Sequence, residues 1–285
     1  MLQIAPRSSA LEGPGAEQLG CRLGGVPYFA HVQTAMPITD PYFYLVTVPA
    51  ILLLGISKSG FGAGFGSLAV PMMALAVSVP QAVAICMPLL FVMDVLGIVA
   101  LRRDFDKTLL KFLLPFALLG TLVGTLLFKW LSASTVAGMV GLLTLLFLAQ
   151  RLFFPPKAIK GALPRWAGGL LTTISGFTSF VAHAGGPPIS AYLIPLKLKP
   201  LVFTATMAYL FFFVNLSKWI PYAWLGLLTW ENFMTSIVLM PLAPIGVWVG
   251  VRIARTIDAT LFYRLVYLGM FLTAIKLIWD GAASY

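Results

Sequence analysis

Charged side chains are scarce in this sequence, and acidic ones most of all. Asp, Glu, Lys and Arg together make up 10% of the 285 residues, and only 9 residues are acidic. Soluble domains carry about 25% charged residues, so this composition excludes an ordinary water-soluble domain. The 2 cysteines, Cys21 and Cys86, have no paired spacing, and the chain contains no metal-binding motif. The sequence therefore indicates no disulfide framework, no metal site and no cofactor.

Hydrophobic residues, by contrast, make up 60% of the chain and occur in long runs. A run of roughly 20 apolar residues matches the thickness of a bilayer. We therefore expect an all-α, multi-pass protein of the cell inner (plasma) membrane, surrounded by lipid. The net charge of +10 does not indicate nucleic-acid binding, because the basic residues lie in short spacers between the runs. The apolar segments form two sets of five, at 42–58, 64–79, 81–101, 108–130 and 134–154, and at 166–182, 184–196, 200–225, 230–251 and 259–280.

The two sets of segments look like copies of one unit. Three residues of the first set recur in the second at one common offset, which is typical of an internal repeat: Pro115, Gly120 and Gly124 reappear as Pro241, Gly246 and Gly250. We expect a first transmembrane repeat at 42–154, a cytoplasmic linker at 155–165 and a second transmembrane repeat at 166–285. Residues 1–41 lack periodicity and are predicted to be a disordered leader. A more membrane-like sequence opens at Met36, and one hypothesis is that translation starts there.

The positions of lysine and arginine predict the orientation, because cytoplasmic loops retain positive charge. Basic residues cluster in the spacer from Arg102 to Lys111 and again at 151–165, so both spacers are expected inside. Alternation then places the spacer at 222–230 outside, although it occupies the same position in its repeat as the first of these spacers. The two repeats are therefore predicted to be inverted. An interfacial aromatic belt is expected at the outer edge, formed by Trp219, Tyr222, Trp224 and Trp230.

Each repeat opens with two segments that are separated by glycine and small polar residues instead of charges. Such a loop indicates a helix pair that is broken or re-entrant within the bilayer, an architecture in which transporters bind substrate near the midplane. A broken helix exposes backbone N–H groups that attract anions, and glycine lets a ligand approach the backbone. The alternative is that these glycines only allow tight helix packing. The predicted substrate-binding residues are Lys58, Ser59, Gly62, Gly64, Gly66, Ser67, His183, Gly185, Gly186 and Pro187.

Charged residues inside apolar segments are the other candidates for function. Asp94 lies about 12 Å from the basic edge of its segment, and a carboxylate at that depth usually marks an ion or proton site. Asn215 holds the similar place in the second repeat, with Lys218 one helical turn later. We predict ion coupling through Asp94, Asn215 and Lys218. Three structural alternatives remain open: Asp94 forms a salt bridge with Lys218 or Lys58, Lys58 extends to the interface, or His183 is only a packed histidine. Lys276 and Asp280 are predicted to be an interfacial pair with no transport role.

The residues at the two glycine breaks also resemble a known family. The segments from Gly62 to Pro71 and from His183 to Pro188 are similar to the duplicated glycine-rich element of TauE/SafE membrane transporters. The likeness spans residues 42–280. The first copy departs from the family's usual run of glycines at Phe65 and Ser67, and the second has Ala184 where glycine is common. The resemblance implies export of small anions, with sulfite and organosulfonates such as sulfoacetate as the associated substrates.

Two other classes of function remain as alternatives. Ser67 and His183 could form the nucleophile and base of an intramembrane hydrolase, and the chain could instead be a non-transporting assembly protein. An assembly protein would give no role to a buried Lys58 and Asp94. A transporter that takes a small anion through a midplane site by alternating access is the leading prediction, with no enzymatic activity. The sequence leaves the substrate, the direction of transport, the coupling ion and the oligomeric state open.

Overall fold

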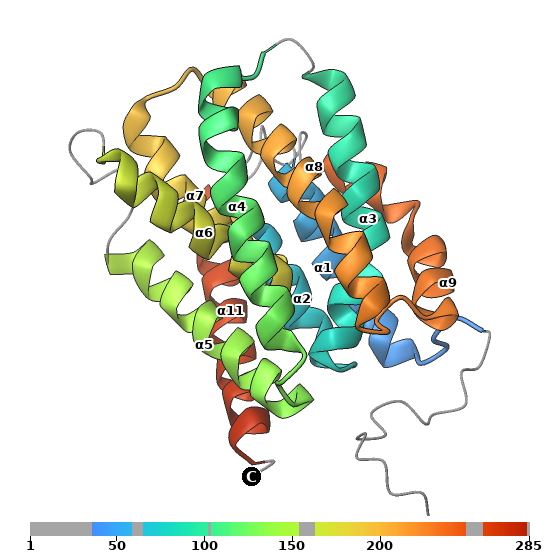
Figure 1. The fold of residues 1–285 in the computed structure, drawn as a ribbon. Helices are drawn as coiled ribbons and strands as arrows, with labels where there is room; N and C mark the ends of the chain where they lie inside the picture. Colours follow the sequence, from blue (N-terminus) through green and yellow to red (C-terminus); the bar gives the residue numbers. More distant parts are fainter. Residues whose placement is uncertain (1–35, 59–64, 102–103, 154–162, 249–258, 284–285) are drawn as a thin grey trace, which may run out of the picture. The chain divides into compact units, whose positions relative to one another are not determined.

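The structure, a computed structural model, describes residues 36–58, 65–101, 104–153, 163–248 and 259–283. Every regular element in these ranges is a helix, in agreement with the predicted all-α class (Figure 1). The predicted leader falls almost entirely outside the described residues. Its last residues are described, and they contact the helices: Ile38 N donates to Thr235 Oγ1 at 3.1 Å, and Asp40 caps the first helix.

Each predicted apolar segment overlaps a helix or a pair of short helices. Among the described residues, four helices are long and apolar enough to cross a bilayer, namely α3, α4, α5 and α8. The chain is therefore a multi-pass membrane protein. In order, the elements are α1 (Pro41–Ile56), η2 (Phe65–Leu68), α2 (Ala69–Met73), α3 (Val79–Ala100), α4 (Lys107–Phe128), α5 (Ala133–Phe153), α6 (Arg165–Ala182), α7 (Gly186–Leu193), η4 (Ile194–Leu196), α8 (Pro200–Trp224), α9 (Trp230–Leu239), a helical stretch at 242–248, and α11 (Ala259–Ala282).

Short polar residues begin several of these helices, because their side chains accept hydrogen bonds from the free N–H groups of the first turn. Asp40, Ser78, Asp106 and Thr229 each accept a backbone N–H bond within the next three residues. The break between α6 and α7 has a different origin. His183 ends α6 in the left-handed conformation, with φ of 52°, and two prolines follow in the first turn of α7.

Close helix contacts depend on small residues. A Cβ atom added at Gly120 of α4 would lie 1.9 Å from the Thr173 carbonyl oxygen of α6, and one at Gly176 of α6 would lie 2.0 Å from the Ala117 carbonyl oxygen of α4. A Cβ atom added at Gly55 of α1 would lie 2.6 Å from the carbonyl carbon of Gly246, in the stretch 242–248. Packing therefore requires glycine at these positions, because small residues let membrane helices approach closely.

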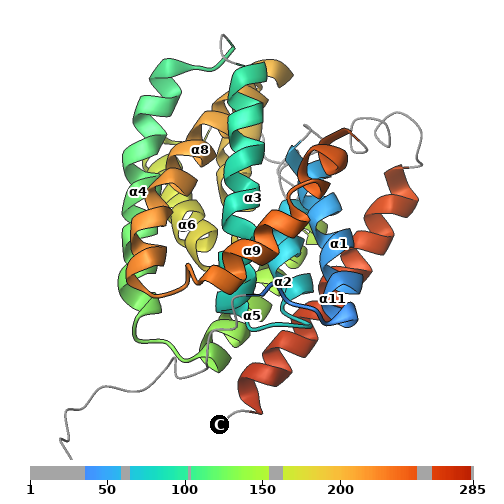
Figure 2. The ribbon, with the colours of Figure 1, turned by 90° about the vertical axis from the view of Figure 1, so that its right-hand side faces the viewer.

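Helices α3 and α8 pack side by side and run in opposite directions (Figures 1 and 2). Phe91 contacts Trp219 with ring centroids 5.9 Å apart, whereas Phe105, just beyond α3, stacks on Tyr209 at 4.0 Å. The end of α3 and the start of α4 consequently lie at one end of the bundle. The end of α8 and the start of α9 lie at the other (Figure 1). Of the predicted aromatic belt, Trp224 and Trp230 are exposed and Trp219 packs on Phe91. Tyr222 does not belong to an exposed belt, because it is fully buried and its hydroxyl donates to the Phe180 carbonyl.

Candidate functional site

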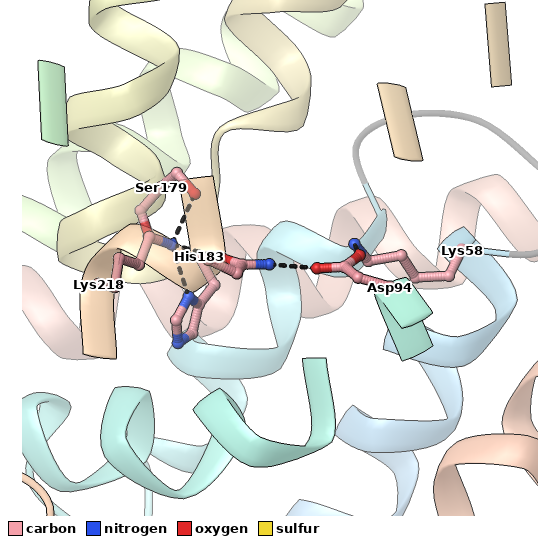
Figure 3. A network of polar contacts seen from close by, with 6 residues as sticks. Lys58, Asp94, Ser179, His183 and Lys218 are labelled. Carbon is pink, nitrogen blue, oxygen red and sulfur yellow. Dashed lines mark hydrogen bonds and ion pairs between the residues drawn. The ribbon is translucent and has the colours of Figure 1, made fainter. Parts of the chain in front are cut away.

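A line of polar contacts crosses the interface between α3 and α8 (Figure 3). Lys58 forms an ion pair with Oδ1 of Asp94. The second carboxylate oxygen of Asp94 accepts a hydrogen bond from Asn215 Nδ2 at 2.5 Å, and Asn215 Oδ1 accepts one from Lys218 Nζ at 2.8 Å. The Asn215 amide thus connects a carboxylate on one side with an ammonium on the other.

Lys218 is fully buried, and its remaining contacts come from the end of α6. Its Nζ donates to the Ser179 carbonyl oxygen at 2.7 Å and to Ser179 Oγ at 2.8 Å. It also lies 3.3 Å from His183 Nδ1, while His183 Nε2 lies 2.9 Å from the Val83 carbonyl oxygen. A carbonyl only accepts, so Nε2 carries a hydrogen, and Nδ1 of a neutral ring then accepts from Lys218.

The sequence places these groups on both predicted repeats. Lys58 follows the end of α1 and Asp94 lies on α3, whereas Asn215 and Lys218 lie three apart on one face of α8. His183 is held at the break by its left-handed backbone, which directs the ring toward both α8 and α3. The network therefore joins the two halves of the chain at the breaks.

A cavity of about 130 Å³ opens beside this network. It is large enough for a small anion with some water, since a single water needs about 10–15 Å³ measured this way. Eight of the predicted site residues line it: Lys58, Gly66, Ser67, Asp94, His183, Gly186, Pro187 and Asn215. The remaining wall is mostly apolar and includes Leu90, Met93, Phe203, Met207 and Phe211, together with Ser179.

The family assignment follows from the chain as a whole. A family model described as Sulfite exporter TauE/SafE matches residues 47–277. The chain belongs to this family. No curated protein and no solved structure matches it. Sulfite and organosulfonate exporters make up the family, so the protein is a membrane transporter whose substrates are small anions.

In this TauE/SafE protein, not every predicted site residue faces the cavity. Ser59, Gly62 and Gly64 lie outside the described residues. Gly185 does not line the cavity, because an added Cβ atom would lie 2.7 Å from both Phe211 Cε1 and the Ser175 carbonyl oxygen. Its glycine is thus explained by packing. Lys218 lies behind the wall and reaches the cavity through Asn215, Ser179 and His183.

Lys58 is part of one of the structural alternatives that the sequence left open. Asp94, 36 residues away in sequence, is its partner, so the salt-bridge alternative describes the structure. The side chain of Asp94 is 1% exposed and that of Lys58 is 23% exposed. Only the lysine therefore reaches toward water in the cavity. Its Nζ also lies 5.5 Å from the centre of the Phe211 ring, a cation–π distance.

The helix ends at the breaks offer fewer N–H donors than the sequence pattern predicted. Pro187 and Pro188 occupy the first turn of α7 and have no amide hydrogen. Helix α2 has only 5 residues and so has little dipole of its own. Positive potential in the cavity must therefore come mainly from the lysines. Sequence reasoning also missed Ser179, Val83 and Tyr222, which hold Lys218 and His183 in place, because a serine, a valine carbonyl and a tyrosine have no distinctive local pattern.

Proposed function

We propose that this TauE/SafE protein exports a small anion, sulfite or an organosulfonate, across the cell inner membrane through the cavity beside Lys58, Asp94 and His183. The observation that carries the proposal is the composition of the site. It places two lysines but a single carboxylate next to a cavity that is otherwise apolar, so an incoming anion meets excess positive charge in a medium of low dielectric constant.

Alternating access between two inverted repeats, 42–154 and 166–285, is the second part of the proposal. Reciprocal packing supports it: α4 of the first repeat packs on α6, the first helix of the second, while the 242–248 stretch packs on α1, the first helix of the first. Asp94 and Asn215, similarly placed in the two repeats, meet directly. Such an exchange of partners is what a two-fold relationship between the repeats produces.

Ion coupling is the third part, and it assigns that role to Asp94 with Asn215 and Lys218. Binding of the anion to Lys58 would separate Lys58 from Asp94, and a carboxylate that loses its cation in a buried site is favoured to take up a proton. The titratable groups that face Asp94, directly or through Asn215, are Lys58, Lys218 and His183, with Tyr222 behind them. Asp94→Asn is expected to remove any pH dependence of the flux.

The proposal assigns no catalysis to the site. Both ring nitrogens of His183 already contact other groups, the Val83 carbonyl oxygen and Lys218 Nζ. A general base for Ser67 needs a free ring nitrogen, so this geometry favours transport over the hydrolase alternative. An assembly protein would have no use for a paired charge beside such a cavity.

Counterflow in proteoliposomes tests the proposal. Vesicles loaded with unlabelled sulfite, sulfate, thiosulfate, sulfoacetate or a small carboxylate are diluted into the labelled anion. We expect uptake above that of protein-free vesicles for at least one sulfur oxyanion or sulfonate. Equal uptake with and without protein for every anion would contradict the proposed function.

A further inference from the structure

The hydrogen bonds around Lys218 fit an ammonium group. Three of its neighbours can only accept at the contact: the Ser179 carbonyl oxygen, Asn215 Oδ1, whose amide nitrogen faces Asp94, and His183 Nδ1, whose ring hydrogen lies on Nε2. An amine has two hydrogens and a lone pair, whereas an ammonium has three hydrogens. Three acceptors around one nitrogen are satisfied by the ammonium form.

The charges of the described residues in the site therefore do not cancel. Among the residues that the structure describes, those lining the cavity or contacting the network include two ammonium groups, Lys58 and Lys218, and one carboxylate, Asp94. His183 is neutral in the arrangement above. Tyr222 donates its hydroxyl hydrogen to the Phe180 carbonyl and is also neutral. Residues 59–64, which the structure does not describe, contain no ionisable side chain.

The position of Asn215 explains why the excess of positive charge is maintained. A second carboxylate at this place would pair with Lys218 and cancel the charge. The amide instead donates to Asp94 and accepts from Lys218, which satisfies both without adding a negative charge. Buried charges that lack a counter-charge are costly, so a site with one uncompensated positive charge is completed by one negative charge from outside.

We infer that the site selects anions with a single negative charge, such as hydrogensulfite or a monosulfonate, over dianions of the same size and shape. This inference rests on the proposed function and adds the charge of the transported species. A dianion would overcompensate the network unless Asp94 were protonated. Sulfite would accordingly cross as hydrogensulfite, together with its proton.

Methanesulfonate and sulfate test the inference, because both are tetrahedral at sulfur and keep one and two negative charges, respectively, across the neutral pH range. The measurement is counterflow of labelled methanesulfonate into proteoliposomes, with unlabelled methanesulfonate or sulfate as competitor. For the parent protein we expect half-inhibition by sulfate to need a concentration at least about tenfold higher than half-inhibition by methanesulfonate. Equal potency, or uptake of labelled sulfate without uptake of labelled methanesulfonate, would overturn the inference.

Two nearly isosteric variants move the charge in opposite directions. Asp94→Asn leaves two uncompensated positive charges, so the preference should shift toward sulfate by at least about tenfold. Asn215→Asp leaves none, so methanesulfonate should lose at least about tenfold in apparent affinity. Asp280→Asn, which removes an exposed carboxylate paired with Lys276, is the matched control and should keep the parent ratio. If Asp94→Asn fails to insert, Asn215→Asp alone decides, and an unchanged affinity in it sinks the inference.

The outcomes also separate the inference from the proposed function. Failure of every anion to exchange in the parent would contradict transport itself, and the inference with it. Exchange of a sulfur oxyanion with a charge preference that neither variant alters would leave transport intact and overturn only the charge assignment.

Discussion

Lys58 is the residue through which an anion is expected to meet the site first, because it is the lysine that reaches the cavity and is partly exposed. Replacing it with alanine removes a charged hydrogen bond, which is worth about 1.5–3 kcal/mol. We therefore expect Lys58→Ala to weaken anion binding roughly ten- to hundred-fold. Equilibrium binding of the anion found in the counterflow screen measures this. Lys276→Ala, at the exposed pair with Asp280, is the control; parent-like binding by Lys58→Ala would place the site elsewhere.

His183 has a backbone role that can be separated from its ring. Its φ of 52° lies in the left-handed region, which costs a residue with a Cβ atom about 1–2 kcal/mol and glycine almost nothing. His183→Ala and His183→Gly both remove the ring and the acceptor for Lys218, so they differ only at the backbone. We expect the glycine variant to unfold at a higher temperature than the alanine variant in detergent. The opposite order would show that the left-handed conformation is not maintained.

Sequence reasoning found the ionisable members of the site but left their pairing open. Asp94, Lys58, His183 and Lys218 are conspicuous because ionisable groups are rare in apolar segments. Asn215 and Lys218 are 3 residues apart, but the other contacts of the site join residues that are 35 to 121 positions apart. For those pairs, only the packing of the helices selects among the possible partners. Ser179 contributes largely through its backbone carbonyl, which every residue has, so no sequence signal could single it out.

At the scale of helices, the contact between α4 and α6 makes the sharpest stability prediction. Gly120→Ala would force a Cβ atom to within 1.9 Å of a backbone oxygen, so α4 and α6 must move apart. Overpacking of this kind costs about 1–3 kcal/mol or more. We expect a lower thermal midpoint and less monodisperse protein in detergent. Gly138→Ala, whose added Cβ atom would lie 3.8 Å from the Gly281 Cα, should behave like the parent, and equal losses in both variants would show that the clash at Gly120 is not the cause.

The helices themselves were predictable from the sequence. Of the breaks between them, only the positions were predictable. Long apolar runs gave the spanning helices, because length and hydropathy alone decide that a segment fits the bilayer. The glycine-rich stretches gave the positions of the breaks. Which glycines face a ligand and which face a helix did not follow, since glycine serves both purposes: Gly66 lines the cavity, whereas Gly185 packs against Phe211 and Ser175.

For the molecule as a whole, the repeat is visible in the sequence through Gly120 and Gly246, and the structure gives these residues the same kind of neighbour. Gly120 contacts α6 and Gly246 contacts α1, so the fourth segment of each predicted repeat packs on the first segment of the other. Interlocking of this kind ties the two repeats together at their broken helix pairs. It leaves the α3–α8 interface, with Asp94 and Asn215, as the place where a relative movement of the repeats would change the network.

The inverted topology predicts that the start of α4 faces the cytoplasm and the end of α8 faces outside. Thr108 and Ala223 are exposed residues at these two places. A Cys21→Ser background removes the cysteine of the leader, and Cys86 is buried. In intact cells an impermeant maleimide should then label Ala223→Cys directly, and Thr108→Cys only after permeabilisation. Arginine and lysine near the start of α4 oppose transfer of that end across the membrane, whereas the segment 219–230 contains no charged side chain. Labelling of both cysteines from the same side would show that the two repeats are not inverted, and the reciprocal packing of α4 on α6 and of 242–248 on α1 would then need another origin.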